Sequence, residues 1–493
     1  MEEIEKQKLK DEQDYIKFAE TLTDPKGNLV AKSTSLGNAD SKRIERMLED
    51  PVSNYVEIAS LMNALVRKNG TVGSTIRYFA SHLTYNHTIY SAPNEKSGFT
   101  ANNSTLEDYL GAATLLDSYG VKRMAPYFAR QVFINGMAFF YEIKDSKGVG
   151  YMEFPIGWGR ISSYKNGVYR WELDISQLKD ELIPYMPNEI QKAYEQMNGN
   201  SALDEKRWRE GKYYRLSDKG VAFCINPEAM TNAGIAISDF ASLLIDSLRL
   251  EKAKNNTDLK DELDAVRLIH GKIPLDKDNK PTIPAKAADR FNQQIQRGMP
   301  SGVVAVSNPF EMTNIPLSGS GATKSYEIVD KAQQQIFLST GTPSSLFGGE
   351  TTSSNIVKLT LEKDSSWLYS TIIPMVQAYY DSVLSSFKSS SGQIFKTKFL
   401  RQSNFTLDND VKRYKEAVTM GGSRLDYLAS LGVDPLEVYS KLIMEQQVLN
   451  IDSFMIPKQT SFTLSGESGD GDGAGRPVTS EPTDDTERIS DSQ

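Results

Sequence analysis

Apolar residues recur every three or four positions from Val52 to Tyr90, which predicts helices there, interrupted by the turn-forming stretch "NGTVGS". The same spacing predicts two further helices, over 104–119 and 121–136. Residues 1–50 are mostly polar, so we expect little of the core to come from them. The N-terminal part of the chain is therefore expected to be helical.

Short runs of alternating apolar and polar residues follow between 137 and 226, which is the pattern of half-buried β-strands. Three pairs of these runs flank the turns "SKG", "KNG" and "DKG", and we expect each pair to form an antiparallel hairpin. Asn166-Gly167 is the strongest of these signals, because both residue types accept the left-handed conformation that a two-residue hairpin turn requires. With an acidic helical insertion expected near 176–210, the pattern predicts an α+β fold.

Helical spacing returns from Ile235 to about Leu263 and again over about 324–339. Between these helices, the sequence pattern over residues 265–321 predicts a small mixed unit of strands and one helix. A helix pair that brackets such a unit could run out and back, and its apolar side would then need cover from other copies of the chain, arranged in a ring. The alternative is that both helices simply pack on the body.

The longest predicted helix covers about 354–388, roughly 50 Å at about 1.5 Å per residue. Pro374 lies inside it and should kink it, because proline removes a backbone N–H and crowds the preceding turn. Farther along, Asp434-Pro435-Leu436-Glu437 has the form of a capping box, which predicts a helix from about 435 to Val448. Residues 465–493 are rich in glycine, serine and acidic residues, and we expect them to be disordered.

Composition and charge narrow the class of protein. No apolar run reaches the roughly 18 residues of a membrane span, and the charged first residues lack the apolar core of a secretion signal. Cys224 is the only cysteine, so neither a disulfide within the chain nor a cysteine-built zinc site is expected. The net charge is −8, of which residues 465–493 contribute −6 (eight acidic residues and two arginines) and the rest −2. Because proteins that grip DNA usually carry a basic surplus, this chain should avoid nucleic acid or touch it without holding it.

The residues that most enzymes need are scarce. His82, His87 and His270 are the only histidines, and the first two, five positions apart, do not align on one helix face. We expect them to be packed or exposed rather than metal-binding or catalytic. Neither a Walker phosphate loop nor a Gly-x-Ser-x-Gly nucleophile motif is present. The chain is therefore not expected to be an enzyme, and we predict no catalytic residue, no metal site and no cofactor.

Several motifs occur in a distinctive order along the chain. They are "RYFASHLTYNHTIY" (77–90), "GTPSSLFGG" (341–349) followed by "SSN" (353–355), "TIIPMVQAYYDSVLSSF" in the long helix, and "GGSRLDYLASLGVDP" (421–435). Together with the order of predicted elements over about residues 50–450, they resemble the portal proteins of tailed bacteriophages, the head-to-tail connector family.

The resemblance implies a portal fold with an α/β wing, a helical stem, a small α/β clip and an α-helical crown, assembled as a ring. In this chain the parts would be a wing at 1–233 with a return segment at about 389–407, stem helices at 234–264 and 322–340, a clip at 265–321, a tunnel loop at 341–355, a long kinked wing helix at 356–388, a crown at 408–464 and a disordered acidic tail at 465–493.

The resemblance also implies partners and a location. The chain would form a homododecamer at one capsid vertex, as a conduit for double-stranded DNA in packaging and ejection. The ring would be a docking platform for the terminase large subunit and the head–tail adaptor. The major capsid protein and, as a further candidate, a scaffold protein would also contact it, with no membrane involved. The protein would lie in the virion, at the portal vertex of the capsid, and in the host cytoplasm during assembly.

The implied tunnel loop is small and polar. Its candidate DNA-channel residues are Gly348, Gly349, Glu350, Thr351, Thr352, Ser353, Ser354 and Lys358. The glycines would let the loop move, the hydroxyls would give weak contacts that ignore base sequence, and the glutamate would discourage tight binding of phosphates. The lysine would be a mild counterweight. The alternative is a plain connector between two helices.

Two other hypotheses stay open at this point. One is a nucleic-acid-processing enzyme with a metal held by carboxylates, which metal-dependent cleavage of DNA would support. The other is a different collar or adaptor protein of the virion.

Overall fold

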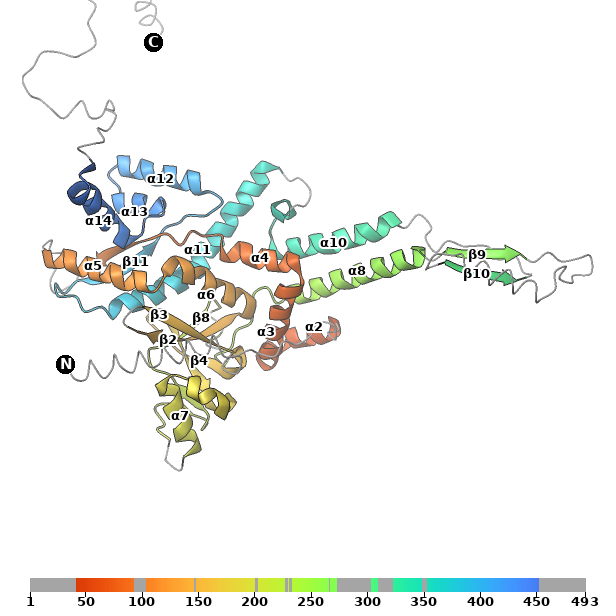
Figure 1. Ribbon diagram of the computed structural model, residues 1–493, viewed down its shortest axis with the longest axis horizontal. Helices are drawn as coiled ribbons and strands as arrows, with labels where there is room; N and C mark the ends of the chain where they lie inside the picture. The colour runs from red at the N-terminus through yellow and green to blue at the C-terminus, as the bar shows by residue number, and fades with distance from the viewer. Residues whose placement is uncertain are drawn as a thin grey trace, which may run out of the picture. The chain divides into compact units, whose positions relative to one another are not determined.

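The computed structural model describes residues 41–92, 103–145, 148–199, 203–226, 229, 233–265, 267–272, 303–308, 322–347 and 353–451. The chain divides into two units, Met1–Val438 and Tyr439–Gln493. The first unit combines helices with mainly antiparallel sheets, which confirms the predicted α+β class (Figure 1). Among the described residues, no helix is both long and apolar enough to cross a lipid bilayer.

The elements follow one another in this order. The helices are α2 (Ser41–Glu49), α3 (Pro51–Lys68), α4 (Gly70–Ala80), α5 (Asn103–Ser118), α6 (Val121–Asn135), α7 (Asn188–Asn198), α8 (Leu243–Ala265), α10 (Ala322–Thr340), α11 (Ser354–Ser385), α12 (Leu407–Thr419), α13 (Arg424–Ser430) and α14 (Pro435–Ile443). The strands are β1 (His87–Ala92), β2 (Met137–Lys144), β3 (Val149–Phe154), β4 (Gly159–Lys165), β5 (Val168–Asp174), β6 (Trp208–Arg209), β7 (Tyr213–Arg215), β8 (Gly220–Cys224), β9 (Arg267–Lys272), β10 (Val303–Asn308) and β11 (Ile394–Phe399).

The N-terminal helices begin where short polar side chains cap them. Asp50 accepts a hydrogen bond from the backbone N–H of Ser53 at the start of α3, and Asn69 caps α4 in the same way. The predicted break over "NGTVGS" is therefore a single residue, Asn69. The prediction that the first 50 residues add little to the core was wrong for α2, because its Ile44 and Met47 are buried.

The helical prediction up to Tyr90 was wrong at its end. Residues 87–92 form β1, which pairs antiparallel with β11, about 300 positions farther along the chain. The partner strand supplies hydrogen bonds that no local pattern reveals. The helices predicted over 104–119 and 121–136 are confirmed as α5 and α6.

Seven of the described strands form the main sheet, in the order β3-β2-β8-β5-β7-β6 with β4 paired to β5. The first two predicted hairpins are confirmed as β2–β3 and β4–β5, and Asn166 and Gly167 both have positive φ. The third prediction was wrong, since β7 and β8 do not pair. β7 lies between β5 and β6, whereas β8 lies between β2 and β5. All five residues of β8 are buried, so an inner position in the sheet suits it better than a surface hairpin.

The main sheet is buried on both faces. Successive residues of β2 point to opposite sides, so Ala138 and Phe140 join the core formed with α3, α4, α6 and α11. Met137 and Phe139 instead join a second core, which is shared with Trp171 and α7. This explains why the sequence of β2 is an almost continuous apolar run.

The helix predicted from Ile235 begins only at Leu243, as α8. Before it, the Ser238 hydroxyl donates to the carbonyl of Phe133, and the N–H of Ala241 donates to the carbonyl of Ser238, three positions back; the N–H of Leu243, the first residue of α8, does the same to Phe240. These tight turns replace the first part of the predicted helix. α8 then lies side by side with α10 (Figure 1). The chain passes from α8 into β9, and β10 precedes α10; the two strands pair in parallel. The helix predicted within the 265–321 unit, over "AKAADRFNQQIQRG" (285–298), lies outside the described residues.

The longest predicted helix is confirmed as α11, with Pro374 inside it. At the start of α14 the N–H of Asp434 donates to Glu437 Oε2 at 3.2 Å, which is one half of the predicted capping box. In the second unit the structure describes residues 439–451, where α14 ends at Ile443 and a π-helical turn, Met444–Val448, follows. The acidic tail at 465–493 lies outside the described residues.

Candidate functional site

The connection between α10 and α11 is anchored at its start. The ring of Phe347 stacks on Phe337 with centroids 5.2 Å apart, and it meets Tyr78 edge-on at 5.8 Å. Lys363 on α11 donates to the carbonyl of Gly341 at 3.0 Å. The first residues of the connection are therefore held against α4, α10 and α11.

The structure describes only some of the eight predicted DNA-channel residues. Gly348, Gly349, Glu350, Thr351 and Thr352 lie outside the described residues. The remaining candidates are Ser353, Ser354 and Lys358, all exposed in or next to the first turns of α11. The structure thus brings three of the eight predicted channel residues together at one helix start.

A buried polar pair stabilises α11 next to this connection. The Tyr78 hydroxyl donates to Asp364 Oδ2 at 2.9 Å, and Lys363 Nζ lies 3.3 Å from Oδ1 of the same carboxylate. Burial raises the pKa of both Tyr78 and Asp364. Close by, Nε2 of His82 lies 2.8 Å from Ser365 Oγ, and burial lowers the pKa of His82 to about 4. His82 is therefore neutral near pH 7, and it is packed, which is one of the two placements expected for it.

The surface of α10 and the start of α11 carries exposed apolar side chains. Leu338 is 74% exposed and Leu359 is 66% exposed, and Tyr326, Ile328 and Ile356 are each more than half exposed. Tyr326 and Ile328 are two residues apart, so at about 100° per residue they lie on nearly opposite sides of α10. Contact with α8 therefore leaves apolar side chains on more than one side of the helix.

A groove runs along α11 at Pro374 and measures about 590 Å³. Its lining residues are Asn166, Tyr369, Ile373, Pro374, Gln377, Ala378, Asp381, Ser382, Ser385 and Lys396. Asp381 also accepts hydrogen bonds from the N–H and the hydroxyl of Thr397, which covers the outer edge of β11. Pro374 is exposed here. Because proline has no N–H, a carbonyl one turn earlier loses its helical donor, and at this exposed position it can bond to solvent instead.

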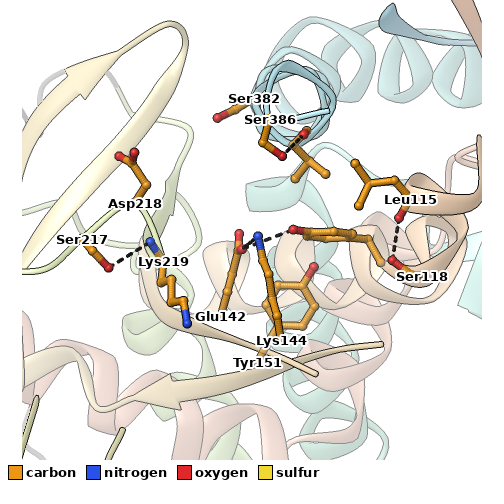
Figure 2. Close-up of polar contacts among 12 residues, drawn as sticks. Leu115, Ser118, Glu142, Lys144, Tyr151, Ser217, Asp218, Lys219, Ser382 and Ser386 are labelled. Carbon is orange, nitrogen blue, oxygen red and sulfur yellow. Dashed lines mark hydrogen bonds and ion pairs between the residues drawn. The ribbon is translucent and has the colours of Figure 1, made fainter. Parts of the chain in front are cut away.

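Glu142 is the centre of a buried polar cluster that sequence reasoning missed (Figure 2). The hydroxyl of Tyr379 donates to its Oε1 at 2.8 Å, and the hydroxyl of Tyr119 donates to Oε2 at 3.4 Å. Lys144 Nζ lies 2.9 Å from Oε2, and the hydroxyls of Tyr151 and Tyr379 are 2.9 Å apart. The cluster joins α11 to β2, β3 and the residue after α5.

The tyrosines of this cluster act as hydrogen-bond donors. Burial, reinforced by the nearby Glu142, raises the pKa of Tyr119 and Tyr379 above the ordinary value, and burial also raises the pKa of Tyr151. They consequently keep their protons at neutral pH. The only signal for this cluster in the sequence is an isolated glutamate in the apolar run of β2. Its chemistry suits a structural anchor for α11, because every named group is paired.

Replacing Tyr379 with phenylalanine should lower the free energy of unfolding by about 2 kcal/mol, because a buried carboxylate then loses a hydroxyl donor. The neighbouring Tyr380 provides a matched control, since its buried hydroxyl has no hydrogen-bond partner among the residues that the structure describes. Tyr380→Phe should leave stability unchanged or raise it slightly. Urea unfolding followed by tryptophan fluorescence measures both. Equal losses in the two variants would show that the Glu142 cluster contributes nothing specific.

The described residues contain no group of three or more histidine, cysteine, aspartate or glutamate side chains placed to hold a metal ion. No protein-family model matches the sequence. None of the curated proteins compared with the chain is significantly similar to it.

Proposed function

We propose that the chain is a portal protein of a tailed bacteriophage, a structural ring through which double-stranded DNA enters and leaves the capsid. In this proposal it is not an enzyme, needs no cofactor, and docks the terminase large subunit and the head–tail adaptor. The order of motifs along the sequence supports the family, and the long α8–α10 pair around β9 and β10 supports the stem and clip.

The observation that carries the proposal is the uncovered apolar surface on α10 and at the start of α11. Burying an apolar side chain such as leucine is worth about 1.5–3 kcal/mol, so five side chains left more than half exposed favour a partner surface. Each copy in a ring touches two neighbours through two different surfaces, and a closed ring leaves no free end. Apolar side chains on opposite sides of α10 fit that arrangement.

The proposed parts then follow the described elements. The wing would contain α2 to α7 and the main sheet, with β11 in its return segment. The stem would be α8 and α10, the clip would contain β9 and β10, and the crown would contain α12, α13 and α14. Ser353, Ser354 and Lys358 would lie where α11 meets the tunnel loop, and their exposure supports weak contact with passing phosphates.

Native mass spectrometry and electron microscopy of the purified protein test the proposal. We expect a closed ring, with the dodecamer as the main species. A protein that remains a monomer at high concentration and physiological salt would contradict it. Incubation of the same sample with DNA and Mg²⁺ distinguishes the enzyme hypothesis, because specific cleavage that carboxylate substitutions abolish would contradict a purely structural role.

A further inference from the structure

The N-terminal half of α5 is attached to the rest of the first unit mainly through one buried carboxylate. Of residues 103–110, all of which the structure describes, only Asp108 is buried, at 5% exposed. The second half of the helix differs, since its Ala112, Ala113 and Leu116 belong to the large apolar core. Segments with few buried apolar contacts open locally at a small cost in free energy. The contacts of Asp108 should therefore decide how firmly residues 103–110 are held.

The loop after α11 surrounds Asp108 with hydrogen-bond donors. The backbone N–H groups of Ser390 and Ser391 donate to Oδ1 and Oδ2 of Asp108 at 2.9 and 2.8 Å. The hydroxyls of Ser389, Ser390 and Ser391 donate to the same two oxygens. All five donors are neutral. Successive backbone N–H groups that converge on one anion form a nest, an arrangement that binds phosphate and other oxyanions in many proteins.

This loop is also held by contacts that do not involve Asp108. Gly392 has φ +72, which turns the chain back on itself, and the N–H of Gln393 donates to Ser389 Oγ at 3.0 Å. The side-chain oxygen of Gln393 in turn accepts a hydrogen bond from Ser91 of β1 at 2.6 Å. We call residues 389–392 the serine cradle. Because β1 and its own turn support it, the serine cradle should keep its shape when α5 moves away.

A second contact of the same half of α5 is weaker. The hydroxyl of Tyr109, which is half-buried, donates to the carbonyl of Pro435 at 3.4 Å. This bond joins two neutral groups at a long distance, whereas the bonds to Asp108 are shorter and have an ionised acceptor. Most of the polar attachment of residues 103–110 therefore lies at Asp108.

The carboxylate of Asp108 carries its full charge at neutral pH. Burial alone would raise the pKa of Asp108, but the hydrogen bonds from Ser391, Ser389 and Ser390 outweigh burial and hold that pKa well below its usual range. The serine cradle thus accommodates a complete negative charge with neutral donors. A change of pH near neutrality would not release it, whereas another anion could compete for the same donors.

We propose that the serine cradle is an oxyanion site and that residues 103–110 are a strap that closes it. In the closed form the occupant is the carboxylate of Asp108. In the open form a small free oxyanion such as inorganic phosphate takes the same N–H and hydroxyl donors. Every contact involved lies within one copy of the chain, so the site exists whether or not copies assemble into a ring.

Hydrogen–deuterium exchange of the full-length protein, followed by mass spectrometry, tests the strap. The test variant is Asp108→Ala, and the matched control is Glu107→Ala, which removes an exposed carboxylate from the same turn. In the test variant we expect the amides of residues 103–110 and 389–393 to exchange at least about tenfold faster, because several hydrogen bonds to a charged group are lost. Residues 111–118 and the control should exchange as in the parent.

Inorganic phosphate then tests the vacated serine cradle. Phosphate should slow the exchange of residues 389–393 in Asp108→Ala by a factor that grows with its concentration, while residues 103–110 continue to exchange rapidly. Sodium chloride at the same ionic strength should not have this effect. The parent protein in the same phosphate buffer corrects for the general stabilisation that phosphate gives to folded proteins.

Four results would overturn the proposal. They are unchanged exchange of residues 103–110 in Asp108→Ala, equal acceleration in Glu107→Ala, no slowing of residues 389–393 by phosphate beyond that of chloride, and faster exchange throughout α5 and α11. The last result would mean that Asp108 supports the core as a whole and holds no separate strap. If Asp108→Ala does not fold, Asp108→Asn gives the same exchange test of the strap, because an amide keeps the shape but faces N–H donors with its own N–H groups.

Discussion

Replacing Gly136 with alanine should destabilise the first unit by about 3–5 kcal/mol and leave little folded protein at 37 °C. Gly136 has φ +82, a conformation that costs alanine energy. A Cβ there would lie 2.6 Å from Cα of Ile237 and closer still to the carbonyl of that residue. To avoid this overlap, the backbone before α8 would have to move away from the α6–β2 corner. The hydrogen bond from the Ser238 hydroxyl to the carbonyl of Phe133 holds it there.

The control for this prediction is Gly120→Ala. Gly120 also has positive φ, at +58, but apart from its own chain neighbours no atom of the described residues lies within 4 Å of the position its Cβ would take. Only the conformational cost should remain, about 1–2 kcal/mol. Urea unfolding and soluble yield at 37 °C measure both variants. Equal losses of stability in the two variants would show that the close approach of Ile237 adds nothing to the destabilisation.

A feature of the fold could be predicted from the sequence when residues close together in the chain determine it. The β4–β5 hairpin could be predicted because Asn166 and Gly167 set the turn by themselves. The β1–β11 pair could not, since strand partners about 300 positions apart leave no trace in a window of ten residues. The same holds for β8, whose place between β2 and β5 depends on two strands that both lie well before it in the sequence.

The candidate sites divide in the same way. The predicted channel residues were contiguous, so the sequence could name them, and the structure describes three of them as exposed. The Glu142 cluster assembles residues 23 and 237 positions apart, and no spacing rule connects them.

Replacing Leu338 and Leu359 together with aspartate should convert the proposed ring into monomers. These side chains are 74% and 66% exposed in one copy, so the substitutions should change the stability of the monomer by only about 0.5 kcal/mol each. At a subunit interface the same changes remove leucine burial and place a charge in an apolar contact. They would cost at least about 4 kcal/mol per interface, or about a thousandfold in affinity.

The control is Leu338→Met/Leu359→Met, which keeps an apolar side chain of similar volume at both positions. Native mass spectrometry should detect rings for the parent and the methionine variant and folded monomers for the aspartate variant, with circular dichroism to verify that both variants are folded. A ring that persists with both aspartates in place would mean that copies associate through some other surface. The proposal that α8 and α10 form the stem would then lose its main support, because exposed leucines would have no partner to bury them.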